Sequence, residues 1–541
     1  MMTDALLTDV QKRLGNDLTA FLPALVVAAA IVLLLLIRML PGRAHRSASI
    51  VALMFGILGV GTSVMQWWAG RFDPRPGAGM ALPLRPLEIF GGMLVFDNFA
   101  IFLNIFLLAF LVALIVLSML TRVVDPEDTT DFYVLLFGAT LGMMLMGMAN
   151  HLLMVFVAIE MASLPSYALA GFLKGKRPSS EAALKYVVYG GGAAGVMLYG
   201  MSLLAGKYGT AYMPDLLRFI AASLGQAPEL IVIMGLLFIF VGLAFKLSAV
   251  PFHFWCPDVF EGAAAEVGAF LSIASKGAAL ALLARFTMPL ASQPEILVPA
   301  LAFIATITTT FGNLAAYSQT NLKRLLAYST IAHAGFMIMG LATLTTQGIE
   351  AVLFYLVTYF LMNLGAFGVV AFLRNATGSE DIRQFRGLVQ RAPILVCSLG
   401  IFMLSLVGLP PLAGFAGKFQ IFAALFDGAK EAASPIVRNS LYALVVVGGL
   451  NTVISLFYYL KVLKVMVLDK PLEEVEGQPV PGLAIGAGQT AFTMILAVLV
   501  VGLGLEWNRL TEATRLGTLN FPTVAAAPLV PAQAAAPEVH R

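Results

Sequence analysis

Long apolar runs are the sequence feature that most limits how this chain can fold. A run of about 20 apolar residues crosses a bilayer as a helix, and helices that satisfy their own backbone groups are one of only two structures that span lipid. About fourteen such runs occur, near residues 20–40, 48–70, 92–120, 131–149, 151–173, 184–206, 229–252, 264–287, 296–317, 325–346, 349–373, 393–426, 437–468 and 485–506. We therefore predict an all-α polytopic membrane protein with about fourteen transmembrane helices.

Composition and charge exclude several other classes of protein. The 541 residues are 60% hydrophobic and 12% charged, whereas soluble domains carry about 25% charged residues. The formal net charge of +3 is too small to favour a nucleic-acid partner. Cys256 and Cys397 form no CxxC motif, and no phosphate-binding GxxxxGK[ST] loop occurs. We therefore expect no redox cofactor and no metal in this chain.

Lysines and arginines in the short loops predict the orientation of the chain. If the runs alternate in direction, one side receives Arg43, Arg46, Lys174, Lys176, Arg177, Lys323, Arg324, Arg374, Arg383, Arg386 and Arg391. We predict that this side faces the cytoplasm of a bacterium and that both termini lie on the periplasmic side of the inner membrane. Arginines in the second loop, at residues 71, 75 and 85, oppose the bias. The first run is interpreted as an anchor that is retained.

Two apolar runs are interrupted by proline close to a lysine. Pro251 follows Lys246 closely, and the pair Pro410 and Pro411 shortly precedes Lys418. Proline removes a backbone donor and clashes with the preceding helical turn, and irregular backbone at membrane depth must be buried in protein or line a wet cavity. We therefore predict one broken helix in each half of the chain.

Paired breaks of this kind indicate an internal repeat. We predict that residues 131–287 and 296–468 form two inverted five-helix repeats, each with its fourth helix broken. Residues 1–130 then supply three amino-terminal helices, and residues 469–541 supply the last helix and a tail. The Ala/Pro-rich part of the tail after Asn520 is expected to be disordered.

Charged side chains inside the apolar runs indicate an ion or proton path. A lysine at the centre of a transmembrane helix costs about 2.5–3.5 kcal/mol and usually faces a bundle interior or water. Lys246, Lys276 and Lys418 meet this description, and Glu160 lies near the middle of its own run. An ionised Glu160 needs a cationic partner, and Lys246 and Lys185 are both candidates. A purely structural ion pair is the alternative.

Two further residues extend this hypothesis. His333 lies inside its run, between Lys276 and Lys418 in the chain, and histidine titrates near neutral pH. It can bridge the two lysines, although a histidine that only packs between helices is an equal alternative. Lys185 enters its run soon after a polar loop, so that snorkelling of its ammonium group to the interface explains it equally well.

Several segments resemble the antiporter-like membrane subunits of respiratory complex I. The resemblance rests on FKLSAVPFHFWCPDVFEG followed by AFLSIASKGA, and on LKRLLAYSTIAHAG and GLPPLAGFAGKF. Within that group, the segments IEMASLPSYALAGF and EAALKYVVYGGGAAG are most similar to subunit N of NADH-quinone oxidoreductase, the homologue of mitochondrial subunit 2. The resemblance covers roughly residues 90–470.

The resemblance implies a subunit that translocates protons while quinone is reduced elsewhere in the complex. It implies that Glu160 pairs with Lys246, that Lys276 is a central relay, and that Lys418 lies on the second broken helix. NADH, FMN, iron–sulfur clusters and quinone are then expected in partner subunits, and other membrane-arm subunits and the lipid bilayer are the expected partners. A stand-alone cation/proton antiporter and a structural scaffold remain the alternatives.

The sequence departs from this pattern at EGAAAEVGAFL, where the family usually reads EGAPTPV or similar. Glu266 is therefore an additional carboxylate shortly before Lys276. We interpret Glu266 as a solvated loop residue and give it no part in a relay.

Overall fold

The computed structural model describes residues 14–39, 47–69, 86–125, 127–226, 228–471, 474 and 483–521. The predictions made for the arginines at residues 43, 46, 71, 75 and 85, and for the tail beyond residue 521, fall outside these ranges.

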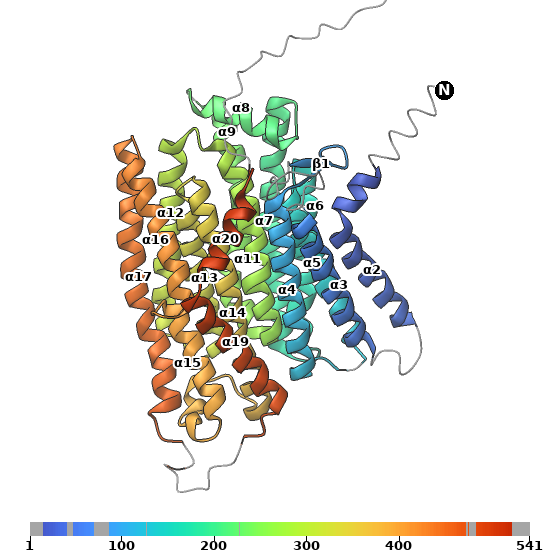
Figure 1. The fold of residues 1–541 in the computed structure, drawn as a ribbon, viewed down its shortest axis with the longest axis vertical. Coiled ribbons are helices and arrows are strands. Elements are labelled where there is room, and N and C mark those ends of the chain that lie inside the picture. Colours follow the sequence, from blue (N-terminus) through green and yellow to red (C-terminus); the bar gives the residue numbers. More distant parts are fainter. Residues whose placement is uncertain are drawn as a thin grey trace, which may run out of the picture.

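The described chain is a bundle of long helices (Figure 1), as the apolar runs predict. Its elements are α2 (Leu22–Met39), α3 (Ala48–Ala69), β1 (Leu87–Ile89), β2 (Leu94–Phe96), α4 (Asn98–Thr121), α5 (Thr129–Met148), α6 (Leu152–Ala170), α7 (Arg177–Tyr208), α8 (Met213–Leu224), α9 (Leu230–Leu247), α10 (Trp255–Gly262), α11 (Ala265–Thr287), η2 (Met288–Leu290), α12 (Pro294–Tyr317), α13 (Leu322–Leu341), α14 (Thr346–Thr377), η3 (Ile382–Phe385), η4 (Leu388–Gln390), α15 (Pro393–Val407), α16 (Ala413–Glu431), α17 (Pro435–Val467), α19 (Ala487–Leu505) and α20 (Asn508–Thr518).

Twelve of the described helices are long and apolar enough to cross a membrane. α13 and the pair α15 and α16 stand in the same bundle without meeting both requirements of length and hydropathy. The chain is therefore a multi-span membrane protein, and the count of fourteen spans stays a prediction.

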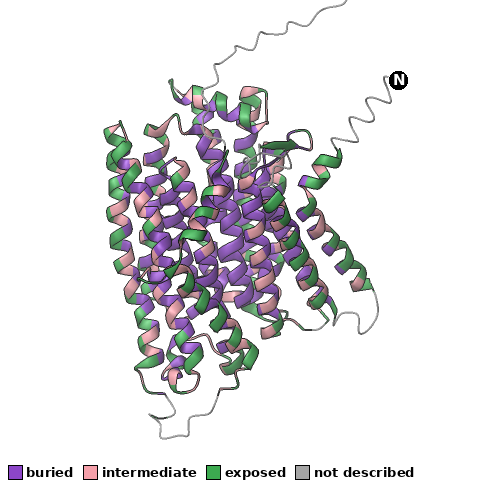
Figure 2. Ribbon diagram, viewed as in Figure 1, coloured by how far each residue is buried: buried purple, intermediate pink, exposed green. Residues whose placement is uncertain are grey.

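Two helices form the centre of the bundle. The apolar stretch of α11 is buried along its whole length, and 94% of that of α14 is buried, as the purple core of Figure 2 shows. α2 and α3 bury only about a third of theirs, at 28% and 33%. A helix that is apolar on every side and buried on every side belongs to a protein core, so α11 and α14 are where charged side chains are shielded from both lipid and water.

Both predicted helix breaks are present. α9 ends at Leu247 and α10 begins only at Trp255, with Pro251 between them. α15 ends at Val407 and α16 begins at Ala413, with Pro410 and Pro411 between them.

Three features differ from the sequence predictions. A short antiparallel hairpin, in which Leu87 lies opposite Phe96, occupies the start of the run predicted near 92–120. The amphipathic helix α8 lies beside this hairpin at one end of the bundle (Figure 1), in the segment between the runs predicted near 184–206 and 229–252. The solvated loop position predicted for Glu266 is wrong, because this residue is in the first turn of α11 and only 1% exposed.

Candidate functional site

The first helix break is closed by a lysine from the neighbouring helix. Lys276 on α11 donates from Nζ to the carbonyl oxygen of Leu247 at 2.9 Å and reaches the carbonyl of Thr330 at 3.5 Å. The carbonyl of Leu247 is one of the groups that the end of α9 leaves without a helical partner. Trp255 also binds the end of α9, because its indole N–H donates to Phe245 O at 3.0 Å, a carbonyl that also accepts from Ser248 N. The break thus fixes Lys276 in the core.

Lys246 and Glu160 face each other across a very small cavity. Both line a space of about 10 Å³ that also touches Ser163, Tyr167 and Gly190, which is near the lower limit for one water molecule. Neither Nζ of Lys246 nor Oε1 of Glu160 has a hydrogen-bond partner among the described residues. The two charges therefore interact through space, and the gap between them is sized for a water that could pass a proton.

The second break is closed in a similar manner by Lys418. This residue on α16 donates from Nζ to the carbonyls of Leu406 at 3.1 Å and Val407 at 2.8 Å, the last residues of α15. Its ammonium group also lies 4.4 Å from the centre of the Phe336 ring, within the range of a cation–π contact. Lys418 follows its break, whereas Lys246 precedes the first one.

His333 on α13 lies between the two lysine sites. One ring nitrogen, Nδ1, is 2.6 Å from the hydroxyl of Tyr355, and Nε2 is 3.1 Å from that of Tyr459. Its charged neighbours are Lys418 and Lys276. Both ring nitrogens are thus held by groups that can donate or accept, an arrangement suited to moving a proton through the ring.

A chain of polar side chains beside Lys276 was not predicted from the sequence. Asn363 on α14 donates to Ser272 Oγ at 2.7 Å and to the hydroxyl of Tyr359 at 3.0 Å. Tyr359 in turn donates to Thr330 Oγ1 at 3.0 Å, and Thr330 is the residue whose carbonyl Lys276 approaches. The signal in the sequence is weak, since only Tyr359 and Asn363, one helical turn apart, mark the polar face of the apolar run near 349–373.

Lys185 lies apart from these groups. Its ammonium group forms ion pairs with Glu181 and Asp258, both at 2.7 Å. Asp258 also pairs with Arg324 at 2.9 Å. Lys185 therefore belongs to a half-exposed charge network that joins α7, α10 and α13, and Glu160 is left with Lys246 as its cationic neighbour.

A buried ion pair on α11 also went unpredicted. Arg285 binds the carboxylate of Asp97 with both terminal nitrogens, at 3.0 and 2.9 Å, and donates to Gly147 O at 2.6 Å. Asp97 also caps α4, because its side chain accepts from Ala100 N. This pair ties the amino end of α4 to the carboxyl end of α11.

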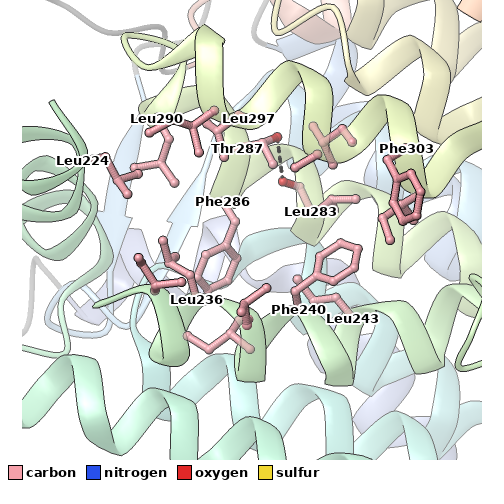
Figure 3. A pocket seen from close by; sticks show the side chains of 17 residues that line it. Leu224, Leu236, Phe240, Leu243, Leu283, Phe286, Thr287, Leu290, Leu297 and Phe303 are labelled. Carbon is pink, nitrogen blue, oxygen red and sulfur yellow. Dashed lines mark hydrogen bonds between the residues drawn. The ribbon is translucent and has the colours of Figure 1, made fainter. Parts of the chain in front are cut away.

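An apolar cavity of about 380 Å³ lies near α9, α11 and α12 (Figure 3). Leucine, isoleucine and phenylalanine dominate its lining, and the one hydroxyl, on Thr287, donates to Leu283 O at 2.9 Å. No titratable side chain lines it, so the residues around this cavity have no group that could bind and release a proton. Across the described residues, no group of three or more His, Cys, Asp or Glu side chains is placed to hold a metal ion.

A family model and individual relatives of known sequence assign this chain to the same family. Residues 149–442 match the family described as "NADH:quinone oxidoreductase/Mrp antiporter, TM". NADH-quinone oxidoreductase subunit N of Anaeromyxobacter sp. (strain Fw109-5) is 39% identical over 472 residues, which are 82% of this chain and 89% of that protein.

Solved structures agree with the sequence comparison. A chain of respiratory complex I from Thermus thermophilus with bound aureothin is 30% identical with a TM-score of 0.71, covering 92% of this chain and 100% of that chain. A chain of the Mrp complex from Dietzia sp. DQ12-45-1b is 19% identical with a TM-score of 0.76, covering 93% and 97%, and shows a shared fold. The chain therefore belongs to the NADH:quinone oxidoreductase/Mrp antiporter family of membrane subunits, among the relatives named NADH-quinone oxidoreductase subunit N.

Proposed function

We propose that this chain moves protons across the membrane as a membrane-arm subunit of a respiratory NADH-quinone oxidoreductase. The observation that carries the proposal is a row of titratable groups inside the bundle, of which Glu160 is half-buried and Lys246, Lys276, His333 and Lys418 are buried. Glu160 and Lys246 share one cavity, and Lys276 holds the carbonyl next to Lys246. His333 lies one turn beyond Thr330 and has Lys276 and Lys418 as its charged neighbours.

The row divides into a switch and a relay. The attraction of Glu160 favours the protonated form of Lys246, so a change in the charge or position of Glu160 alters how firmly that lysine holds its proton. A proton released by Lys246 can pass to Lys276, then through His333 and its two tyrosine hydroxyls to Lys418. The hydroxyl groups and the ring nitrogens can each donate and accept.

Partner subunits supply the energy in this proposal. Moving one charge against 100 mV costs about 2.3 kcal/mol, and we infer that quinone reduction elsewhere in the complex provides it. NADH, FMN, iron–sulfur clusters and quinone would bind those partners. The membrane is the bacterial inner membrane, with the loops between α6 and α7, α12 and α13, and α14 and α15 on the cytoplasmic side.

We further propose that residues 131–287 and 296–468 are inverted repeats. The support is that each contains one broken helix, and that in each a buried lysine binds the carbonyls at the end of the first half-helix. Repeats built around discontinuous helices are typical of membrane transporters.

The purified intact complex in liposomes tests the function. With an uncoupler present, the Lys276→Ala variant should reduce quinone at the wild-type rate. Without the uncoupler, it should translocate fewer protons per electron. Lys430→Ala, an exposed lysine near the end of α16, should pump as the wild type does. Full pumping by Lys276→Ala would overturn the relay.

Two further measurements separate this function from the alternatives. Cation-dependent proton flux by this chain alone in liposomes would favour a stand-alone antiporter. If charge-neutralising variants reduced the amount of assembled complex in proportion to pumping, the lysines would serve only as a scaffold.

A further inference from the structure

Glu266 is a buried carboxylate that the proposed relay does not use. It is 1% exposed in the first turn of α11, and its Oε2 has no hydrogen-bond partner among the residues that the structure describes. Thr121 and the backbone N–H of Glu266 itself interact with the carboxyl group but leave Oε2 without a partner among the described residues, and burying an unpartnered polar atom costs free energy. A carboxylate kept in this place therefore needs a reason.

Compensation of neighbouring cations does not supply that reason. Lys323 and Arg374 are the cations that act on Glu266. Both are already paired with Glu380, at 2.9 and 3.2 Å, and Lys323 also donates to Ala263 O at 2.7 Å. Glu266 is thus an extra negative group beside an ion-paired cluster.

Two members of this cluster are partly open to solvent. The side chains of Glu380 and Arg374 are 15% and 19% exposed, whereas that of Lys323 is 3% exposed. They lie at the start of α13 and the end of α14, the end of the bundle away from α8. Protons from that side can reach the cluster, whose two cations interact electrostatically with the buried Glu266.

A second unpartnered atom lies further inward on the facing helix. Asn363 Oδ1 is buried and has no hydrogen-bond partner, although the amide nitrogen of the same side chain binds Ser272 and Tyr359. Ser272 follows Glu266 by about 9 Å along α11, at about 1.5 Å per residue. Buried oxygens without a partner among the described residues, such as Glu266 Oε2 and Asn363 Oδ1, are the sites where buried water would find partners.

We propose that Glu266 is the proton-uptake site for Lys276. Its carboxylate takes a proton from water at the Lys323–Glu380–Arg374 cluster and releases it to water beside Asn363. This water lies near Ser272, which accepts from Asn363 and precedes Lys276 by one helical turn on α11, and it passes the proton to the neutral amine of Lys276. Each step transfers one proton, and no electron or leaving group is involved. The inference rests on the proposed function and names where its protons are loaded.

Glu266→Gln tests the proposal in the intact complex, because glutamine keeps the shape of the side chain and cannot take up a proton. We expect assembly and uncoupled quinone reduction at wild-type levels, with fewer protons translocated per electron. Infrared difference spectra recorded on turnover should also lose a carboxyl band, a readout that a purely structural role would leave unchanged. Glu295→Gln is the matched control, since Glu295 is likewise in the first turn of a helix but exposed.

Comparison with Lys276→Ala separates the two proposals. If Lys276→Ala loses pumping while Glu266→Gln pumps fully and retains every carboxyl band, the uptake site is wrong and the relay stands. If Lys276→Ala itself pumps fully, the relay is wrong. Should Glu266→Gln only lower the amount of complex, with the proton-to-electron ratio of the remaining complex unchanged, Glu266 is structural and the proposal is overturned.

Discussion

At the scale of single residues, three buried lysines are stabilised by different surroundings. Lys276 and Lys418 donate to carbonyls that helix breaks have freed, whereas Lys246 has no hydrogen-bond partner among the described residues. Lys246 has Glu160 as its charged neighbour, so the charge or position of Glu160 can alter how firmly this lysine holds its proton.

Replacing His333 with alanine should interrupt transfer between Lys276 and Lys418. The change also leaves the buried hydroxyl of Tyr355 without its His333 partner, at a cost of about 1–3 kcal/mol for an unsatisfied group, whereas Tyr459 keeps its hydrogen bond with Ser329. We expect fewer protons per electron in liposomes and a lower melting temperature of the complex. Normal pumping together with a lowered melting temperature would show that His333 only packs between helices.

Some of these residues could be predicted from the sequence and others could not, for physical reasons. A lysine in an apolar run is visible because its cost is large, so Lys246, Lys276 and Lys418 could be named. Glu266 was placed in a loop because nothing in AAAEVG distinguishes the first turn of α11 from the segment before it. The partners of His333 were invisible, since Tyr355 and Tyr459 lie far apart in the chain and meet it only after folding.

At the scale of elements, the breaks depend on close backbone contact. A Cβ atom on Gly414, in the first turn of α16, would overlap the carbonyl of Ser405 on α15. The half-helices therefore pack as closely as they do only because this residue is glycine.

Gly414→Ala should accordingly separate α15 from α16 and weaken the contact of Lys418 with Val407. We expect less assembled complex and a lowered melting temperature. Gly449→Ala on α17 is the control, because a Cβ there has nothing within 4 Å and alanine favours a helix by roughly 0.5–1 kcal/mol. Equal stability of the two variants would contradict the packing described for the break.

The Asp97–Arg285 pair should be a larger contributor to stability. Asp97→Ala leaves a guanidinium group that is 4% exposed without its counter-ion, which typically costs about 3–5 kcal/mol. Asp131→Ala removes an exposed pair with Arg38 and should cost less than about 1 kcal/mol. Thermal unfolding of the detergent-solubilised complex measures the loss of stability in both variants. Equal decreases in melting temperature would contradict the larger contribution expected of the buried pair.

At the scale of the whole molecule, the sequence predicted the class of fold and the position of both breaks. Hydropathy is read directly from composition over about 20 residues, so twelve of the predicted runs correspond to described helices long and apolar enough to cross a membrane, with errors at their ends, and the count of fourteen stays a prediction. Short elements escaped, because α8 and the β1–β2 hairpin are too short to give such a signal. The central position of α11 and α14 could not be foreseen, since both lipid and a protein core select apolar residues.

The most direct test concerns the pair at the start of the row. Protons translocated per electron should be measured in liposomes for the intact complex carrying Glu160→Gln or Lys246→Ala, with electron transfer recorded under uncoupled conditions. We predict that both variants retain electron transfer and lose the share of proton translocation that passes through this chain. Wild-type proton-to-electron ratios in both variants would contradict the proposal that Glu160 and Lys246 switch a proton relay.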